Sequence, residues 1–159
     1  MLKIEYHIQR FSRHLQMADE YTGYGGAMCQ ISRLWVKNQC SEALALADEW
    51  IAKAEQEKEL YWMDMLCLLA SSVAESMQHF GLAVRYCENV LSHEDGKDSV
   101  TAMALYNMAG ATFRQGEIDL AKQYAARSYA LASHSEEKTK LSLAELLVKV
   151  WPDVVNWKA

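Results

Sequence analysis

Residues 103–131 read MALYNMAGATFRQGEIDLAKQYAARSYAL, and this stretch decides the fold. In its first half, Leu105 and Met108 recur at helical spacing, as do Leu120 and Tyr124 in its second half. Gly116 lies between the halves, where the end of a helix favours a residue that tolerates left-handed backbone angles. The pattern predicts an antiparallel pair of amphipathic helices. Such a pair leaves an apolar face uncovered when it is alone, so the pattern also predicts neighbouring copies.

Three parts of this pair resemble the tetratricopeptide repeat, namely LYNMA at 105–109, FRQGEI at 113–118, and Ala121. Two earlier stretches of the chain resemble the same repeat more loosely. Trp50 departs from it, because the family usually has a small residue at that position. The resemblance implies an all-α, right-handed superhelix of three helical hairpins that binds other proteins.

The repeat unit is longer than is usual for this family. Ala43, Ala83 and Ala121 hold equivalent positions, at spacings of 40 and then 38 residues, against about 34 in the common repeat. Units of this length resemble those of kinesin light chains and of bacterial peptide-sensing regulators. We predict one domain over 1–159, with hairpins at 27–56, 60–92 and 98–132, an N-terminal capping helix at 2–21, a C-terminal capping helix at 136–151 and a tail at 152–159.

Both ends of the chain leave two alternatives open. Residues 2–21 predict an amphipathic helix that either caps the repeats or serves as a dimerisation arm. The glycine-rich residues 22–26 predict a flexible joint after this helix. The apolar tail either folds back onto the repeats or docks on another chain.

Composition and charge exclude several classes of protein. The 159 residues are 51% hydrophobic with a formal net charge of −5 and no basic stripe, which argues against a nucleic-acid partner. The apolar runs are too short to span a membrane, and the N-terminus lacks the pattern of a signal peptide. The four cysteines form no CxxC pair, which predicts buried thiols in a reducing, cytoplasmic compartment.

Residues with catalytic or metal-binding chemistry are scattered. As residues of one helix, His7 and His14 would stand about 10 Å apart along its axis, too far to share one ion. The acidic pairs are adjacent in sequence, and adjacent helical positions do not face each other. No phosphate loop, nucleophile elbow or dinucleotide fingerprint is present. We therefore expect no enzyme activity, no cofactor and no metal.

The first helices of the three hairpins predict a concave groove for a protein or peptide segment. Met and aromatic side chains would supply apolar contacts, with Asn107 and Arg114 orienting the partner. The chaperone adaptors of this family clamp a terminal carboxylate with basic and amide groups, which Asn107 and Arg114 resemble. The other positions where such groups would be needed hold Met28, Met65, Leu68 and Met103. The predicted lining is Met28, Ser32, Trp35, Met65, Leu68, Ser72, Glu75, Met103, Tyr106, Asn107, Gly110, Phe113 and Arg114.

Two other functions fit the same pattern. The size, acidity and leading helix are similar to those of small dimeric type III secretion chaperones. The repeat length is similar to that of the peptide-sensing part of a bacterial regulator. A homodimer would form through the N-terminal helix or through the C-terminal tail.

Overall fold

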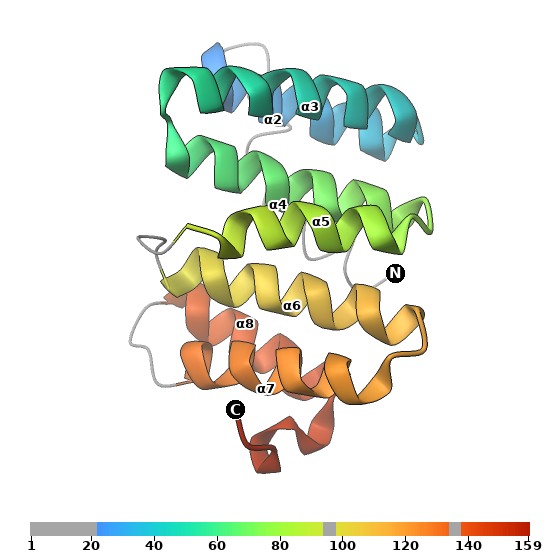
Figure 1. The fold of residues 1–159 in the computed structure, drawn as a ribbon, viewed down its shortest axis with the longest axis vertical. Helices are drawn as coiled ribbons and strands as arrows, with labels where there is room; N and C mark the ends of the chain where they lie inside the picture. The colour runs from blue at the N-terminus through green and yellow to red at the C-terminus, as the bar shows by residue number, and fades with distance from the viewer. Residues whose placement is uncertain (1–21, 94–97, 134–137) are drawn as a thin grey trace. The chain divides into compact units, whose positions relative to one another are not determined.

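The computed structural model describes residues 22–93, 98–133 and 138–159 (Figure 1). The helices are α2 Gly23–Val36, α3 Cys40–Glu57, α4 Leu60–Ser76, α5 Phe80–Leu91, α6 Asp98–Arg114, α7 Ile118–Ser133, α8 Lys138–Val150 and the 3₁₀ helix η1 Pro152–Asn156. No strand occurs in these ranges, so the predicted all-α class is confirmed. The capping helix predicted at 2–21 lies outside the described residues.

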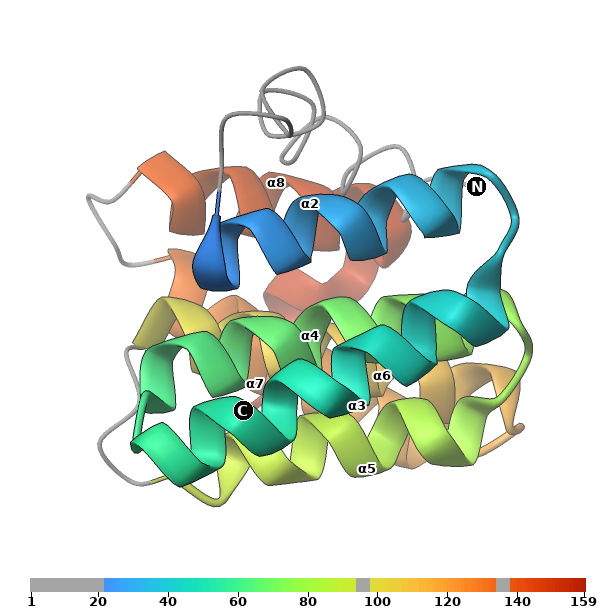
Figure 2. The same cartoon turned by 90° about the horizontal axis from the view of Figure 1, so that it is seen from above.

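Contacts divide the chain into two compact units. Unit 1 is Met1–His79 and unit 2 is Phe80–Ala159. In unit 1, α2 and α3 form an antiparallel pair, and α4 packs against both (Figure 2). In unit 2, α5, α6 and α7 pack in succession, and α8 packs back on α7 and α6.

The turns that end α2, α4 and α6 share one geometry. Asn38, Gln78 and Gly116 have left-handed backbone angles, with φ of 62°, 62° and 85°. After each of them, an amide donates to the carbonyl five residues earlier, which is the Schellman arrangement. These bonds are Gln39 to Leu34 at 2.8 Å, His79 to Ala74 at 2.9 Å and Glu117 to Thr112 at 3.0 Å. The left-handed residues recur after 40 and 38 residues, as the alanines do in the sequence.

Small residues allow the paired helices to approach closely. Ala43, Ala83 and Ala121 each follow a left-handed residue by five positions and are at most 2% exposed. In unit 2 the buried Ser128 hydroxyl donates to the carbonyl of Ala102 at 2.6 Å, which joins α7 to α6. The positions that mark the repeat length in the sequence are thus buried in all three second helices.

Residues 22–26 correct one prediction. The sequence predicted a flexible joint there, but Thr22 is the extended N-cap and Gly23 begins α2. The Tyr24 ring stacks on Trp62 at 5.7 Å between centroids and meets Trp50 edge-on at 5.5 Å. This packing outweighs the low helix propensity of glycine, about 1 kcal/mol per residue. The first helix of this hairpin thus begins four residues before the predicted residue 27.

The C-terminal elements fold back onto unit 2. Residues 134–137 are outside the described ranges, and α8 ends at Val150. Pro152 then begins η1, which packs against α7 and α8. Val154 is 0% exposed, and Lys122 Nζ lies 5.7 Å from the centroid of the Trp157 ring. Of the two alternatives for the tail, the structure shows the folded-back one.

The four cysteines are free thiols. Cys29, Cys67 and Cys87 are buried as predicted, and burial raises the pKa of the Cys29 thiol. Cys40 differs from the prediction because it is partly exposed. It is the first residue of α3, where the helix end meets solvent.

Candidate functional site

The predicted groove residues fall at repeated positions in α2, α4 and α6. Met28, Leu68 and Tyr106 each lie ten residues before the left-handed residue of their turn. The residues six positions before the left-handed residue are Ser32, Ser72 and Gly110. The residues three positions before it are Trp35, Glu75 and Phe113. Each of the three first helices therefore has the same set of positions on its own recurring face.

Most of this face is buried, although the sequence predicted an open lining. Ten of the thirteen residues are buried, Gly110 is partly exposed, and Phe113 and Arg114 are exposed. The buried ones are Met28, Ser32, Trp35, Met65, Leu68, Ser72, Glu75, Met103, Tyr106 and Asn107. In this conformation, only the end of α6 presents the predicted lining to solvent.

Within unit 1, several of the predicted residues are held by contacts inside the fold. The Trp35 indole donates from Nε1 to Ser76 Oγ at 2.9 Å, which ties the end of α2 to the end of α4. The Ser72 hydroxyl donates to the Leu68 carbonyl at 3.2 Å, one turn earlier in α4. Ser32 Oγ is buried and makes no hydrogen bond to any described residue.

Within unit 2, the predicted face of α6 is covered by the residue that follows α8. The Trp151 ring lies edge-on to Tyr106 and to Phe113, with both centroid distances at 6.5 Å. The Arg114 guanidinium lies 5.9 Å from the centroid of the Phe80 ring, within the range of a cation–π contact. The capping segment thus occupies part of the groove that the sequence assigned to a partner.

Buried polar side chains concentrate on the first helices. Of the eight that are buried in the described residues, only Ser128 lies on another helix. Ser71, Ser72 and Thr112 donate to carbonyls of their own helices. The other four are Ser32, Asp64, Glu75 and Asn107. Buried polar side chains are uncommon in protein cores, so this concentration distinguishes the first helices from the second helices.

An aromatic cluster in unit 1 was missed by the sequence reasoning. Tyr24, Trp50 and Trp62 are half-buried, and Tyr61 lies edge-on to Trp62 at 5.4 Å. Lys53 Nζ lies 4.6 Å from the centroid of the Trp50 ring. The departure of Trp50 from the family pattern was the available signal. The cluster joins the start of α2 to the second half of α3 and the start of α4.

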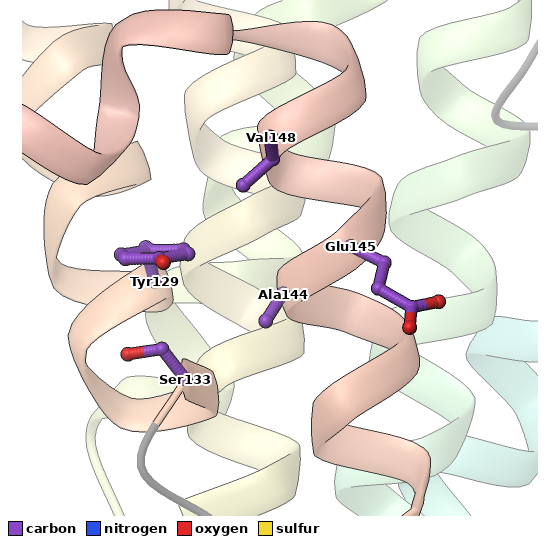
Figure 3. Close-up of a pocket in the computed structure, with 5 residues that line it drawn as sticks. All are labelled: Tyr129, Ser133, Ala144, Glu145 and Val148. Carbon is purple, nitrogen blue, oxygen red and sulfur yellow. The ribbon is translucent and has the colours of Figure 1, made fainter.

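A pocket of about 400 Å³ lies between α7 and α8 (Figure 3). Its lining is Tyr129, Ser133, Ala144, Glu145 and Val148. Ala144 and Val148 lie on the side of α8 that faces α7, whereas the Glu145 carboxylate points to the opposite side. The lining therefore lacks the converging polar groups that fix a ligand's orientation.

The described side chains include no group of three or more His, Cys, Asp or Glu that is placed to hold a metal ion. Likewise, none of the helices in the described ranges has the length and apolarity needed to cross a bilayer. Comparison of the chain with protein-family models, with curated proteins and with solved structures finds no match.

Proposed function

We propose that this protein is a non-catalytic binding module that recognises a protein or peptide segment as an adaptor or scaffold in the cytoplasm. The observation that carries the proposal is the recurring face of α2, α4 and α6. It repeats at the same positions before each turn, and its three helices hold seven of the eight buried polar side chains in the described ranges. Apolar burial would supply affinity, and the polar groups would set the orientation of the partner.

The proposal includes a tetratricopeptide-type stacking of the helix pairs into a right-handed superhelix. The recurrence of one turn geometry after 40 and 38 residues supports it. Small residues at equivalent positions in α3, α5 and α7 support it further, because close-packed hairpins of one length stack regularly.

The test uses the accessible end of the proposed site. A phage-displayed library of amphipathic helical peptides is selected on the immobilised full chain, and the Kd values of the selected peptides are measured. Phe113→Ala and Arg114→Ala should each weaken binding at least tenfold, which corresponds to about 1.4 kcal/mol. Both side chains are exposed, so the thermal stability of the chain should change little.

Two controls match these variants in exposure. Val155 is 51% exposed against 49% for Phe113, and Arg127 is exposed as Arg114 is. Val155→Ala and Arg127→Ala should leave the Kd unchanged. If selected peptides bind the Phe113 and Arg114 variants as tightly as the wild type, the face of α6 is not the binding site.

A further inference from the structure

An aromatic and acidic surface lies at one end of unit 1, where α2 begins and the chain turns from α3 into α4 (Figure 2). Its four rings are connected, because Tyr24 contacts Trp50 and Trp62. Trp62 in turn contacts Tyr61, which is 48% exposed, and the other three rings are half-buried. We call this surface the aromatic end of unit 1, and it consists of Tyr24, Trp50, Glu57, Glu59, Tyr61 and Trp62.

The rings that join α2 to α3 stand where the α6–α7 pair has small residues. Tyr24 lies fourteen residues before the left-handed residue of its turn, as Ala102 does in α6. Trp50 lies twelve residues after it, as Ser128 does in α7. Ala102 and Ser128 are 0% exposed and joined by a hydrogen bond, so the pair packs closely with small residues at these positions. The partly exposed rings of the α2–α3 pair therefore exceed what packing of a hairpin requires.

Carboxylates lie beside these rings. Glu57 ends α3 and accepts a hydrogen bond from the Tyr24 hydroxyl, and Glu59 is the N-cap of α4. Burial raises the pKa of Tyr24, and the hydrogen bond to Glu57 and the charges of both carboxylates raise it further. Residues 48–59 include five acidic residues and two basic ones. The surroundings of the rings are therefore negative.

The fold already places one cation on this surface. Lys53 Nζ lies 4.6 Å from the centroid of the Trp50 ring, within the range of a cation–π contact. Ring faces attract cations through their quadrupole, and carboxylates attract them through charge. Both attractions select the same kind of ligand. Among side chains, arginine matches both, because its planar guanidinium stacks on rings while its N–H groups pair with carboxylates.

We propose that the aromatic end of unit 1 binds an arginine side chain of a partner protein segment. The guanidinium stacks on the exposed ring of Tyr61 and pairs with the Glu59 carboxylate. Since these residues are two positions apart, their Cα atoms are at most about 7 Å apart, within the reach of one guanidinium. This is a second binding surface, and it does not depend on the α6 face of unit 2.

The experiment uses the full chain and a fluorescent nonapeptide that carries three arginines among glycine and serine, with the Kd measured by anisotropy. Tyr61→Ala with Glu59→Gln should weaken binding by about tenfold, since each lost contact accounts for about threefold. Tyr61→Phe keeps the ring and should bind within about twofold of the wild type. A second peptide has citrulline, which keeps the shape of arginine without its charge, and it should not bind.

A matched pair of substitutions in unit 2 controls for charge and exposure. Glu117 follows a left-handed residue and precedes a helix, as Glu59 does. Phe113 is 49% exposed, against 48% for Tyr61. Phe113→Ala with Glu117→Gln should change the Kd of the arginine peptide by less than about twofold. Glu59 makes no side-chain capping hydrogen bond, so the Glu59 variant should fold, and far-UV circular dichroism checks this.

Several results would overturn the inference. Absence of binding to the wild-type chain would do so, as would equal affinity for the arginine and citrulline peptides. An equal loss in the matched pair would place the peptide elsewhere, and tighter binding of a lysine peptide would exclude guanidinium recognition. A dimer in light scattering that Tyr61→Ala with Glu59→Gln dissociates would place a second copy of the chain on this surface. Loss of library-peptide binding in the Phe113 variant concerns the proposed function alone.

Discussion

Tyr24 links two tryptophan rings of unit 1 to an acidic group. Its hydroxyl donates to Glu57, and its ring contacts Trp50 and Trp62. Burial, the hydrogen bond to Glu57 and the charges of Glu57 and Glu59 raise the pKa of Tyr24 to about 12 from its ordinary 10.0. The neutral phenol is therefore the form that the folded chain favours.

This shift predicts the pH dependence of stability at high pH. Between pH 10 and 12 the folded chain keeps the Tyr24 proton while the unfolded chain loses it. The contribution to the free energy of unfolding is thus complete below pH 10 and is lost as the pH rises to 12. Urea denaturation at several pH values should show this loss, and Tyr24→Phe should remove it. Glu57→Gln, which keeps an acceptor, should remove only part. An unchanged slope in Tyr24→Phe would contradict the assignment.

Trp35 shows why single residues of the site were hard to place from the sequence. Its spacing on α2 predicted a side chain that faces a partner, yet its indole nitrogen donates to Ser76 on α4. Met28 and Leu68 are buried in the same way. Helical spacing identifies which residues share a face, but it contains no information about what packs on that face.

At the scale of elements, the turns were easier to predict than the ends. Gly116 was predicted as a left-handed residue and is one, and Asn38 has the same backbone conformation. Gln78 adopts the same backbone although glutamine rarely does, at a cost of about 1–2 kcal/mol. The ends differ because residues 22–26 and 152–156 become helical through contacts with distant rings and helices.

The docking of η1 on α7 predicts a contrast between two adjacent valines. Val154 is 0% exposed and Val155 is 51% exposed. Val154→Ala should lower the free energy of unfolding by about 2 kcal/mol, since it removes buried methyl groups and leaves a cavity. Val155→Ala should change it by less than about 0.5 kcal/mol. Thermal denaturation measures both, and equal effects would mean that η1 does not dock as described.

At the scale of the whole molecule, the ends of the chain bear on oligomeric state. The folded-back tail buries Val154 within its own chain, so it has no need of a second chain to cover this residue. This packing favours a chain that does not self-associate through its C-terminal tail.

We therefore predict a monomer of 18.1 kDa across a tenfold range of concentration, measured by light scattering after gel filtration. Deletion of residues 152–159 should lower the thermal stability without changing the mass per particle. A stable dimer would contradict this prediction and would favour the secretion-chaperone alternative. A dimer that the deletion dissociates would assign self-association to the tail.

The sequence by itself determined the helical class, the repeat length and the residues that share a face. These follow from local periodicity and turn chemistry, as in residues 103–131 and at Gly116. Only the tertiary structure decided that most of that face is buried, that Trp151 covers Tyr106 and that Tyr24 lies against Trp50 and Trp62. The reason is physical: burial and ring contacts join residues far apart in the chain, and such pairs leave no periodic signal in the sequence.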